Sequence, residues 1–595
     1  MTAGRLSRSD GIAAALLWLA TVVIFGAGAA RLGFYVDDGF WLAELPSLPL
    51  SGLWEAVRNR MPGRNLHVVW LYSLYKAAGN PMAHLPALHL VQSGIDGLVV
   101  AAFYVLLRLL NLPGRAALLA SAGFAFWPLH GQTHFLPDSL AANQISTLFT
   151  ILFAVTRLLR ARGQSGWRLA ALEAAAFAGA LFTYDQVLVA LLVVVAAGGR
   201  FRALEAVYVA LAGFHIWLRL TLGGGPEAPA SANLAALVAG NALHALSITA
   251  GRAGWIHVAP LYSRTSAADW LLALLAAAAV AAAAWRAPAA GPPARRGLLL
   301  ALAAAFWAAA YLPIWLWYPS PRHHYLPSAG LFAAAAVVLS LLPRLAAVTL
   351  AGGMVFVMAA ACRGESRFWE ESFVARRQLF AELSPQLAGK QILALENFPA
   401  SHGPALLVSP HDAHYAPQLL ERRLPAHGFV GTVASAPAPG GIFVETDSPE
   451  GFRYHRTGNF LVARFTSWEN GSLRYQQNPV EPLPYDILSA RAGPGSETFR
   501  LHRVSAARRA AEVLLSLDLD APLRPGAHLA LVLRPDWGHS DRVFPLLLAS
   551  SGGRLELVVR LARFPPSDRL EARFYQASPD APPALLGRAA VPIEP

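Results

Sequence analysis

The chain has 595 residues, of which 55% are hydrophobic and only 14% are charged, and its formal net charge is +12 at pH 7. Soluble globular proteins carry about 25% charged residues, so this composition excludes an ordinary soluble protein. The basic side chains are almost all arginines at the ends of apolar runs, which argues against a nucleic-acid-binding face. The single cysteine, Cys362, excludes a disulfide within the chain.

Long apolar runs fill the chain up to residue 362. A helix of roughly 18 or more apolar residues is long enough to cross a bilayer, and the runs predict about eleven such helices. They cover residues 12–33, 86–107, 116–130, 139–158, 169–184, 186–198, 203–221, 268–285, 297–316, 326–342 and 345–361. The first run reads as an uncleaved signal anchor. Between the runs, residues 34–65 and 222–267 are predicted to be long loops and 66–79 an interfacial helix.

Arginines at the joints between these runs predict the orientation. If the N-terminus is cytoplasmic, every predicted cytoplasmic joint is basic, as the positive-inside rule requires. These joints carry Arg5, Arg8, Arg108, Arg115, Arg157, Arg160, Arg162, Arg168, Arg200, Arg202, Arg286, Arg295, Arg296 and Arg344. The short outer joints at 130–138 and 184–185 hold no Arg or Lys. We therefore expect an integral protein of a bacterial inner (cytoplasmic) membrane.

Residues 363–595 form a second predicted domain, soluble and on the outer face, which follows the transmembrane domain of residues 1–362. A helix is expected at 363–382, and short alternating runs between Pro- and Gly-rich turns then predict a mostly β, α+β domain. Such runs stand at 393–395, 441–444, 515–517, 528–533 and 555–559. Nothing in this region indicates its role.

Two adjacent carboxylates, Asp37 and Asp38, follow the first apolar run. Such a pair at a membrane interface is costly unless it faces water, a metal ion or a cationic substrate. One of the two could act as a general base toward a hydroxyl group. The alternative is the ordinary polar start of a loop.

A second group of polar residues ends the run at 116–130 and comprises His130, Gln132, His134 and Asp138. Two imidazoles and a carboxylate at one helix end could line a site or bind a divalent metal ion. Helix capping followed by a solvated loop is the alternative.

A third group, Arg322, His323 and Tyr325, stands at another predicted outer joint, and Arg64 is a further arginine on that side. A guanidinium group binds phosphate in a bidentate manner, so these residues suit a phosphate ligand. Contact with lipid headgroups is the alternative. The predicted orientation places all three groups on one face, an arrangement suited to transfer from a lipid phosphate to a hydroxyl group.

Five short motifs occur in an order that resembles the GT-C superfamily of polyprenyl-phosphate-sugar-dependent glycosyltransferases, most closely the protein O-mannosyltransferase-like branch. They are Asp37-Asp38, Arg64-Asn65-Leu66, Gly79-Asn80-Pro81, Trp127-Pro128-Leu129-His130 and Pro321-Arg322-His323-His324-Tyr325-Leu326-Pro327-Ser328-Ala329-Gly330. The resemblance covers about residues 12–345. It implies a GT-C-like transmembrane catalytic domain.

The implied reaction is inverting transfer of a sugar from a polyprenyl phosphate to a hydroxyl group of a protein, glycan or lipid at the outer face. Asp37 or Asp38 would then be the base, Arg64, Arg322 and His323 would hold the donor phosphate, and the other residues of the three groups would line the site. The partners are the lipid-linked donor, membrane lipids and the acceptor, without nucleic acid. No cofactor is indicated beyond the divalent metal ion that the histidines could bind.

The chain departs from the family pattern at several positions. Trp127 replaces the first histidine of a His-Pro-x-His pattern, Gln132 stands where an acidic residue is usual, and Asn65 replaces a proline. Thr183-Tyr184-Asp185 stands where Ser-Lys-Glu is common. Two other interpretations therefore stay open, a transporter or flippase for a lipid-linked glycan and a catalytically inactive scaffold of an envelope glycan pathway.

Overall fold

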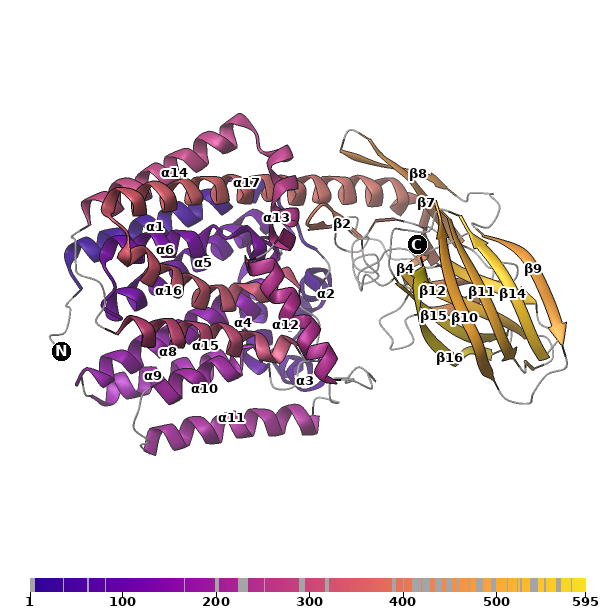
Figure 1. The fold of residues 1–595 in the computed structure, drawn as a ribbon, viewed down its shortest axis with the longest axis horizontal. Coiled ribbons are helices and arrows are strands. Elements are labelled where there is room, and N and C mark those ends of the chain that lie inside the picture. The colour runs from indigo at the N-terminus through magenta and orange to yellow at the C-terminus, as the bar shows by residue number, and fades with distance from the viewer. Residues whose placement is uncertain are drawn as a thin grey trace. The chain divides into compact units, whose positions relative to one another are not determined.

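A computed structural model of the chain contains a helical part and a β-rich part (Figure 1). It describes residues 6–35, 37–60, 64–80, 82–164, 166–197, 203–222, 234–250, 252–287, 295–315, 320–387, 392–396, 398–399, 401–408, 419, 429–433, 441–445, 452–456, 460–469, 471–477, 485–493, 499–510, 512–521, 523–524, 527–535, 544–549, 553–562, 569–578 and 581–594. The chain divides into two compact units. Unit 1 is Met1–Phe34, Trp41–Glu371 and Gly403–Ala405, and unit 2 is Tyr35–Phe40, Ser372–His402 and Leu406–Pro595.

Helices build unit 1. The α-helices of the chain are α1 (Arg8–Gly26), α2 (Asp37–Glu44), α3 (Leu50–Arg60), α4 (Asn65–Ala78), α5 (Leu85–Leu109), α6 (Gly114–Ala125), α7 (Gln132–Phe135), α8 (Ser146–Ala161), α9 (Trp167–Leu181), α10 (Val187–Ala197), α11 (Ala203–Leu222), α12 (Leu234–Ala250), α13 (Arg252–Val258), α14 (Ala267–Arg286), α15 (Arg296–Trp315), α16 (Tyr325–Leu341) and α17 (Arg344–Leu383). Among the described residues, eight helical stretches are long and apolar enough to cross a membrane. They are Arg8–Arg31, Leu85–Leu109, Leu140–Ala161, Leu204–Thr221, Ala267–Arg286, Arg296–Trp315, Pro321–Leu341 and Arg344–Gln386. This confirms a polytopic helical membrane region.

Of the about eleven predicted spans, these eight are long and apolar enough to cross a membrane among the described residues. The other three apolar runs form short helices, α6 with 12 residues, α9 with 15 and α10 with 11. Helix α6 ends just before Trp127 and Pro128, because proline cannot donate a helical hydrogen bond and restricts the residue before it. An apolar run of this length is also what a helix buried inside a bundle requires, and nearly all of α6 is buried.

Two further expectations concern the segments around the spans. The predicted loop at 34–65 contains two helices, α2 and α3, so it is more ordered than its polar composition indicates. The helix expected at 66–79 is present as α4. The last predicted span and the following helix at 363–382 are one continuous helix, α17, of 40 residues.

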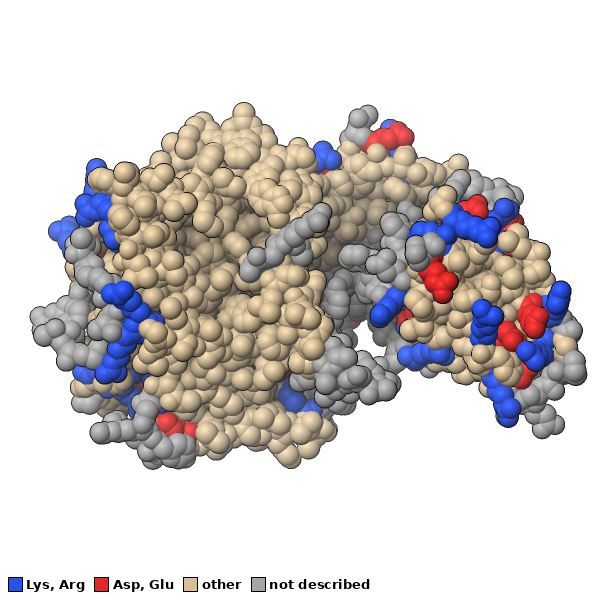
Figure 2. Space-filling view, viewed as in Figure 1, with Lys and Arg blue, Asp and Glu red and all other residues tan. Residues whose placement is uncertain are grey.

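Several of the arginine-bearing joints that were predicted to lie on the cytoplasmic side are close together in the structure. Their arginines bond to residues of neighbouring joints. The contacts are Arg108 Nε to Asp10 Oδ1 at 2.7 Å, Arg115 Nη2 to the carbonyl of Leu342 at 2.8 Å, Arg162 Nη2 to Asn111 Oδ1 at 3.1 Å and Arg344 Nη2 to the carbonyl of Ala287 at 3.3 Å. Figure 2 shows basic side chains gathered at the end of the helical part that carries the N-terminus, beside a broad face with few charges. The side of the membrane that this end faces stays a prediction.

Buried ion pairs join helices near the same joints. Arg157 and Arg160 of α8 both contact Glu173 of α9, at 3.2 and 2.7 Å, and the nearest guanidinium nitrogen of Arg157 lies 3.0 Å from Glu205 of α11. The phenol of Tyr208 donates to the same Glu173 carboxylate at 2.9 Å. Because Glu173 is fully buried, these partners are what makes its burial tolerable.

Unit 2 contains a mixed, strongly curved sheet with open edges, shaped as a half-barrel (Figure 1). Its eight strands follow the order β13 (Phe544–Ala549), β12 (His528–Pro535), β15 (Arg569–Ser578), β16 (Ala581–Glu594), β10 (Arg500–Arg509), β11 (Glu512–Ala521), β14 (Gly553–Leu561) and β9 (Tyr485–Gly493). Neighbours pair antiparallel except β10 and β16, which are parallel.

A second sheet of unit 2 has the order β4 (Phe429–Val433), β1 (Ile392–Glu396), β7 (Phe460–Glu469) and β8 (Ser472–Gln477). Here β1 is parallel to both its neighbours. The remaining strands are β2 (Ser401–His402), β3 (Ala405–Leu406), β5 (Gly441–Glu445) and β6 (Phe452–Arg456). The prediction of strands at the five alternating runs is confirmed, and most pairs between the described strands are antiparallel, the parallel ones being β1 with its two neighbours and β10 with β16.

The core of the large sheet follows from the period of two along its strands. Every second residue of β11 is buried, among them Leu515, Leu517 and Leu519. They pack with Leu531 of β12 and Leu557 of β14 in one apolar cluster. Successive side chains of a strand point to opposite faces, so the alternation buries one face of the sheet.

Helices α15 and α16 approach closely at Gly330. A Cβ atom at this position would lie 2.7 Å from the carbonyl oxygen of Ala303 and 2.9 Å from the amide nitrogen of Trp307, both in the backbone of α15. Small residues let membrane helices pack at such short range.

We expect Gly330→Ala to destabilise the protein by about 1–3 kcal/mol, because the added methyl group meets backbone that cannot move aside. Gly213→Ala in α11 is the matched control, since nothing lies within 4 Å of its Cβ position. The measurement is the thermal unfolding of both variants in lipid nanodiscs. Equal melting temperatures for the two variants would contradict the close approach.

Candidate functional site

Asp185 gathers three basic side chains at the turn between α9 and α10. Its carboxylate lies 2.8 Å from Arg64 Nε, 3.1 Å from His215 Nε2 and 3.1 Å from Arg219 Nη2. Arg64 directly precedes α4, whereas His215 and Arg219 are one turn apart on α11 and therefore share a face of that helix. One carboxylate thus fixes three elements that are far apart in the sequence.

Arg322 lies in the short turn η6 (Pro321–His324) before α16 and pairs with Asp138 across 3.4 Å. The backbone carbonyl of Arg322 also accepts hydrogen bonds from Asn143 Nδ2 at 3.0 Å and Thr133 Oγ1 at 3.4 Å. Asn143 belongs to a π-helical turn, η4 (Leu140–Ile145), a distortion that is frequent at functional sites. The turn that carries Arg322 is therefore held through both its backbone and its side chain.

Tyr184 and His323 connect the two ion pairs. Tyr184 Oη lies 2.9 Å from His323 Nε2, and the guanidinium carbon of Arg64 lies 4.7 Å from the centre of the tyrosine ring. Gln186 Nε2 donates to the carbonyl of His323 at 2.7 Å. We call the resulting group the cation cluster; it consists of Arg64, Asp138, Tyr184, Asp185, His215, Arg219, Arg322 and His323.

The cation cluster has an excess of positive charge. Among its described members, three guanidinium groups face two carboxylates, a difference of one positive charge when the histidines are neutral. Burial alone would raise the pKa of Asp185, but Arg64, His215 and Arg219 hold it below its usual range, so this carboxylate is ionised. Nearby His67 is neutral, because burial together with Arg64 and Arg322 lowers its pKa to about 3. The cluster is thus suited to a singly charged anion.

His130, His134 and Tyr325 belong to a separate, buried network around Asp96. The carbonyl of Phe124 can only accept, so His130 Nε2, 3.1 Å away, carries a hydrogen. Burial and His134 lower the pKa of His130 well below its usual value, which keeps His130 neutral, and its Nδ1 accepts from His134 Nε2 across 3.1 Å. His134 Nδ1 lies 2.8 Å from Asp96 Oδ2, and the Tyr325 hydroxyl donates to Asp96 Oδ1.

The acidic pair of residues 37 and 38 lies at the start of α2, in unit 2. Asp38 is fully buried, and its Oδ2 accepts from the amide of Tyr35 at 2.9 Å while its own amide donates to the Tyr35 carbonyl. The bond from the Tyr35 amide to the Asp38 carboxylate corresponds to one half of a capping box, so Asp38 helps to anchor the helix start. The side chain of Asp37 lies outside the described part of the chain.

The four polar residues predicted to act together after the run at 116–130 do not form one site in the structure. Asp138 belongs to the cation cluster, whereas His130 and His134 bond to each other inside the bundle. Gln132 is half-buried at the start of α7. Within the described ranges, no group of three or more His, Cys, Asp or Glu is arranged to hold a metal ion. A divalent metal ion therefore stays a prediction without identified ligands.

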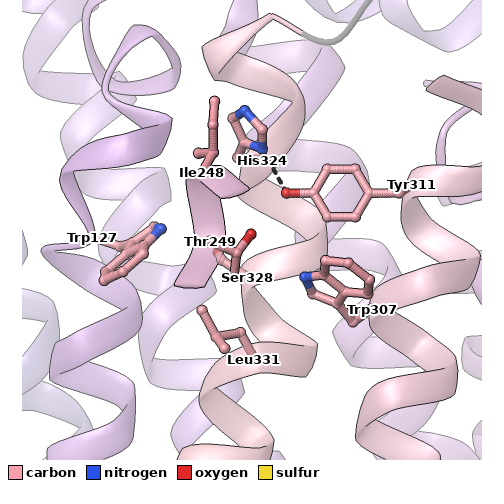
Figure 3. A pocket seen from close by; sticks show the side chains of 8 residues that line it. All are labelled: Trp127, Ile248, Thr249, Trp307, Tyr311, His324, Ser328 and Leu331. Carbon is pink, nitrogen blue, oxygen red and sulfur yellow. Dashed lines mark hydrogen bonds between the residues drawn. The ribbon is translucent and has the colours of Figure 1, made fainter. Parts of the chain in front are cut away.

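A small hollow lies beside the turn that carries Arg322 (Figure 3). Its lining residues come mainly from α12, α15 and α16 and are Trp127, Ile248, Thr249, Trp307, Tyr311, His324, Ser328 and Leu331. His324 Nδ1 and the Tyr311 hydroxyl are hydrogen-bonded at 2.5 Å across it. The consecutive residues His323 and His324 therefore face different neighbours, the first Tyr184 and the second this aromatic hollow.

Four members of the cation cluster were not among the residues predicted from the sequence: Tyr184, Asp185, His215 and Arg219. The first two had been read only as a departure from a family pattern that loses a basic residue. The signal for the others was present, since His215 and Arg219 are spaced four apart in an apolar run and so occupy one face of a helix. Their common partner could not be predicted, because it belongs to another joint.

We expect Asp185→Asn to lower stability by about 1–3 kcal/mol, since it leaves the guanidinium groups it holds without their carboxylate. The pKa of Asp185 is depressed, so its contribution is present above the ordinary aspartate pKa of about 3.9 and is lost only as pH falls through the depressed value. The loss of melting temperature should therefore be constant between about pH 5 and pH 8. Asp486→Asn, which removes a solvent-exposed pair with Arg560, is the control and should have little effect.

The Asp96–His134 contact should appear as coupling in a double-mutant cycle. We expect the destabilisation caused by Asp96→Asn and His134→Gln together to differ from the sum of the single effects by about 0.5–3 kcal/mol, because the two side chains are in direct contact. The cycle of His134→Gln with Glu173→Gln, whose partners lie on α8 and α11, should be additive. Additivity in both cycles would refute this coupling.

Comparison of the chain with protein-family models, with characterised proteins and with solved structures found no match. The function proposed below therefore depends on the cation cluster itself and on the motif resemblance that the sequence predicts.

Proposed function

We propose that the protein is a membrane glycosyltransferase that moves a sugar from a polyprenyl-phosphate donor to a hydroxyl acceptor at the outer face of the membrane. Its helical part would be a GT-C-type catalytic domain, and its partners would be the lipid-linked donor, membrane lipids and a protein, glycan or lipid acceptor. The observation that carries the proposal is the cation cluster. It contains the two arginines that the motif resemblance assigns to the donor phosphate, together with a net positive charge.

The geometry of the cluster supports phosphate binding. Arg64 and Arg322 reach it from joints more than 250 residues apart, and both are held by carboxylates, Asp185 and Asp138. A guanidinium group fixed in this way need not reorganise when negative charge develops on a leaving phosphate, which is the condition for electrostatic catalysis.

In the proposed reaction the acceptor hydroxyl oxygen attacks the anomeric carbon of the sugar while the bond from that carbon to the phosphate oxygen breaks. The polyprenyl phosphate leaves with the bonding electrons, and a base takes the hydroxyl proton. We assign the base to Asp37, because one oxygen of Asp38 is already used at the start of α2. This role of Asp37 rests on the resemblance.

The test is an incubation of purified protein in lipid with a panel of polyprenyl-phosphate sugars and candidate acceptors, measuring release of free polyprenyl phosphate. We expect the wild type to release it from one donor class, and Asp37→Asn to reduce the rate at least a hundredfold at unchanged donor affinity. Arg322→Gln should instead weaken donor binding about tenfold or more, since it removes a charged hydrogen-bond donor. Arg264→Gln, outside the cation cluster, is the control for loss of an arginine.

Each outcome separates the competing interpretations. A folded wild type that releases no polyprenyl phosphate with any donor and acceptor would refute the glycosyltransferase. Transport of the lipid-linked sugar across liposomes without its cleavage would identify a flippase instead. Full activity of Asp37→Asn would overturn only the assignment of the base.

A further inference from the structure

We propose that Tyr184 is a neutral hydrogen-bond donor to the phosphate of the donor substrate. This inference rests on the proposed function and adds a residue to its site. Tyr184 lies in the turn between α9 and α10, beside Asp185, with its ring under the guanidinium of Arg64 and its hydroxyl against His323. Its side chain is almost completely buried, so the fold restricts the groups that its hydroxyl can contact.

The protonation of His323 decides the direction of its hydrogen bond with Tyr184. The backbone amide of Ser320 can only donate, and it lies 3.0 Å from His323 Nδ1. This nitrogen must therefore be the unprotonated acceptor of the ring, and a neutral imidazole then carries its hydrogen on Nε2. His323 Nε2 consequently donates to Tyr184 Oη across 2.9 Å, and the tyrosine oxygen is the acceptor.

In this arrangement the hydroxyl hydrogen of Tyr184 is not used in the bond to His323. A phenol can both accept and donate, and its oxygen already accepts from His323. The described residues offer the hydrogen no acceptor, because His323 Nε2 is the only hydrogen-bond partner of the hydroxyl group among them. A nearly buried donor without an acceptor is costly, so the site favours a ligand that supplies one.

The surroundings of the hydroxyl group select an anionic acceptor. The guanidinium of Arg64 lies over the ring face, and the charges of both Arg64 and Arg322 act on the tyrosine. The positive excess of the cluster favours an oxygen that carries negative charge, and a phosphate oxygen accepts both from guanidinium groups and from a phenol. Tyr184 therefore adds a donor to the site without adding a further charge.

Tyr184→Phe is the sharpest variant, because it retains the ring under Arg64 and removes only the hydroxyl group. We expect the affinity of the protein in nanodiscs for a short-chain polyprenyl phosphate to fall about tenfold or more, since hydrogen bonds to charged groups are worth about 1.5–3 kcal/mol. In the transfer assay the donor KM should rise more than kcat falls. Tyr208→Phe, which removes another buried hydroxyl group, should leave the affinity unchanged.

A second measurement separates ligand binding from a structural role. A fluorotyrosine placed at position 184 keeps the ring and the hydroxyl group but loses its proton at lower pH, so affinity for the phosphate should be lost at lower pH than in the wild type. Equal affinity of Tyr184→Phe and wild type, or an unchanged pH profile with fluorotyrosine, would overturn the role of Tyr184 alone. A wild type that binds no polyprenyl phosphate would overturn the proposed function and this inference together.

Discussion

A charged side chain inside an apolar helical bundle needs a partner of opposite charge, because removing one ion from water costs several kcal/mol that only pairing offsets. Unit 1 meets this constraint at several places where its helices enclose charge. Arg157 pairs with Glu173, Arg363 with Asp269, and Arg64 with Asp185. Each pair joins different helices or joints, so the requirement for pairing also fixes which elements are neighbours.

The same constraint explains why the cation cluster is a better candidate site than the other polar groups. The pairs around Glu173 balance two arginines with two glutamates, and the single carboxylate of the Asp96 network contacts His134 and Tyr325. The described members of the cation cluster instead comprise three guanidinium groups and two carboxylates. An excess charge near the end of a bundle is stabilised by an anionic ligand.

Paired arginines are also better placed to act on a ligand than flexible ones. The carboxylates of Asp185 and Asp138 hold their arginines through packed elements, and the carbonyl of Arg322 is bound independently of its side chain. A fixed dipole or charge contributes to transition-state stabilisation without moving during the reaction. The residues that position the arginines are thus as important to the proposed activity as the arginines themselves.

The sequence by itself determined the class of the protein and the positions of many of its elements. Apolar runs located the membrane helices, the Trp127-Pro128 break ended α6, and alternating residues such as Leu515 and Leu517 located strands of unit 2. These features follow from local periodicity and from backbone restrictions, which neighbouring residues encode. The number of full spans did not follow, because a buried helix and a spanning helix have the same composition over about twelve residues.

Only the tertiary structure decided which polar residues act together. Arg64 meets Asp185 across 121 residues, Arg322 meets Asp138 across 184, and the tautomer of His323 depends on the backbone of Ser320. No periodic pattern encodes a pairing between joints, because it arises from how the helices pack in three dimensions. For this reason the sequence indicated the arginines of the site but not Tyr184 or Asp185, whose roles depend on the partners that folding brings to them.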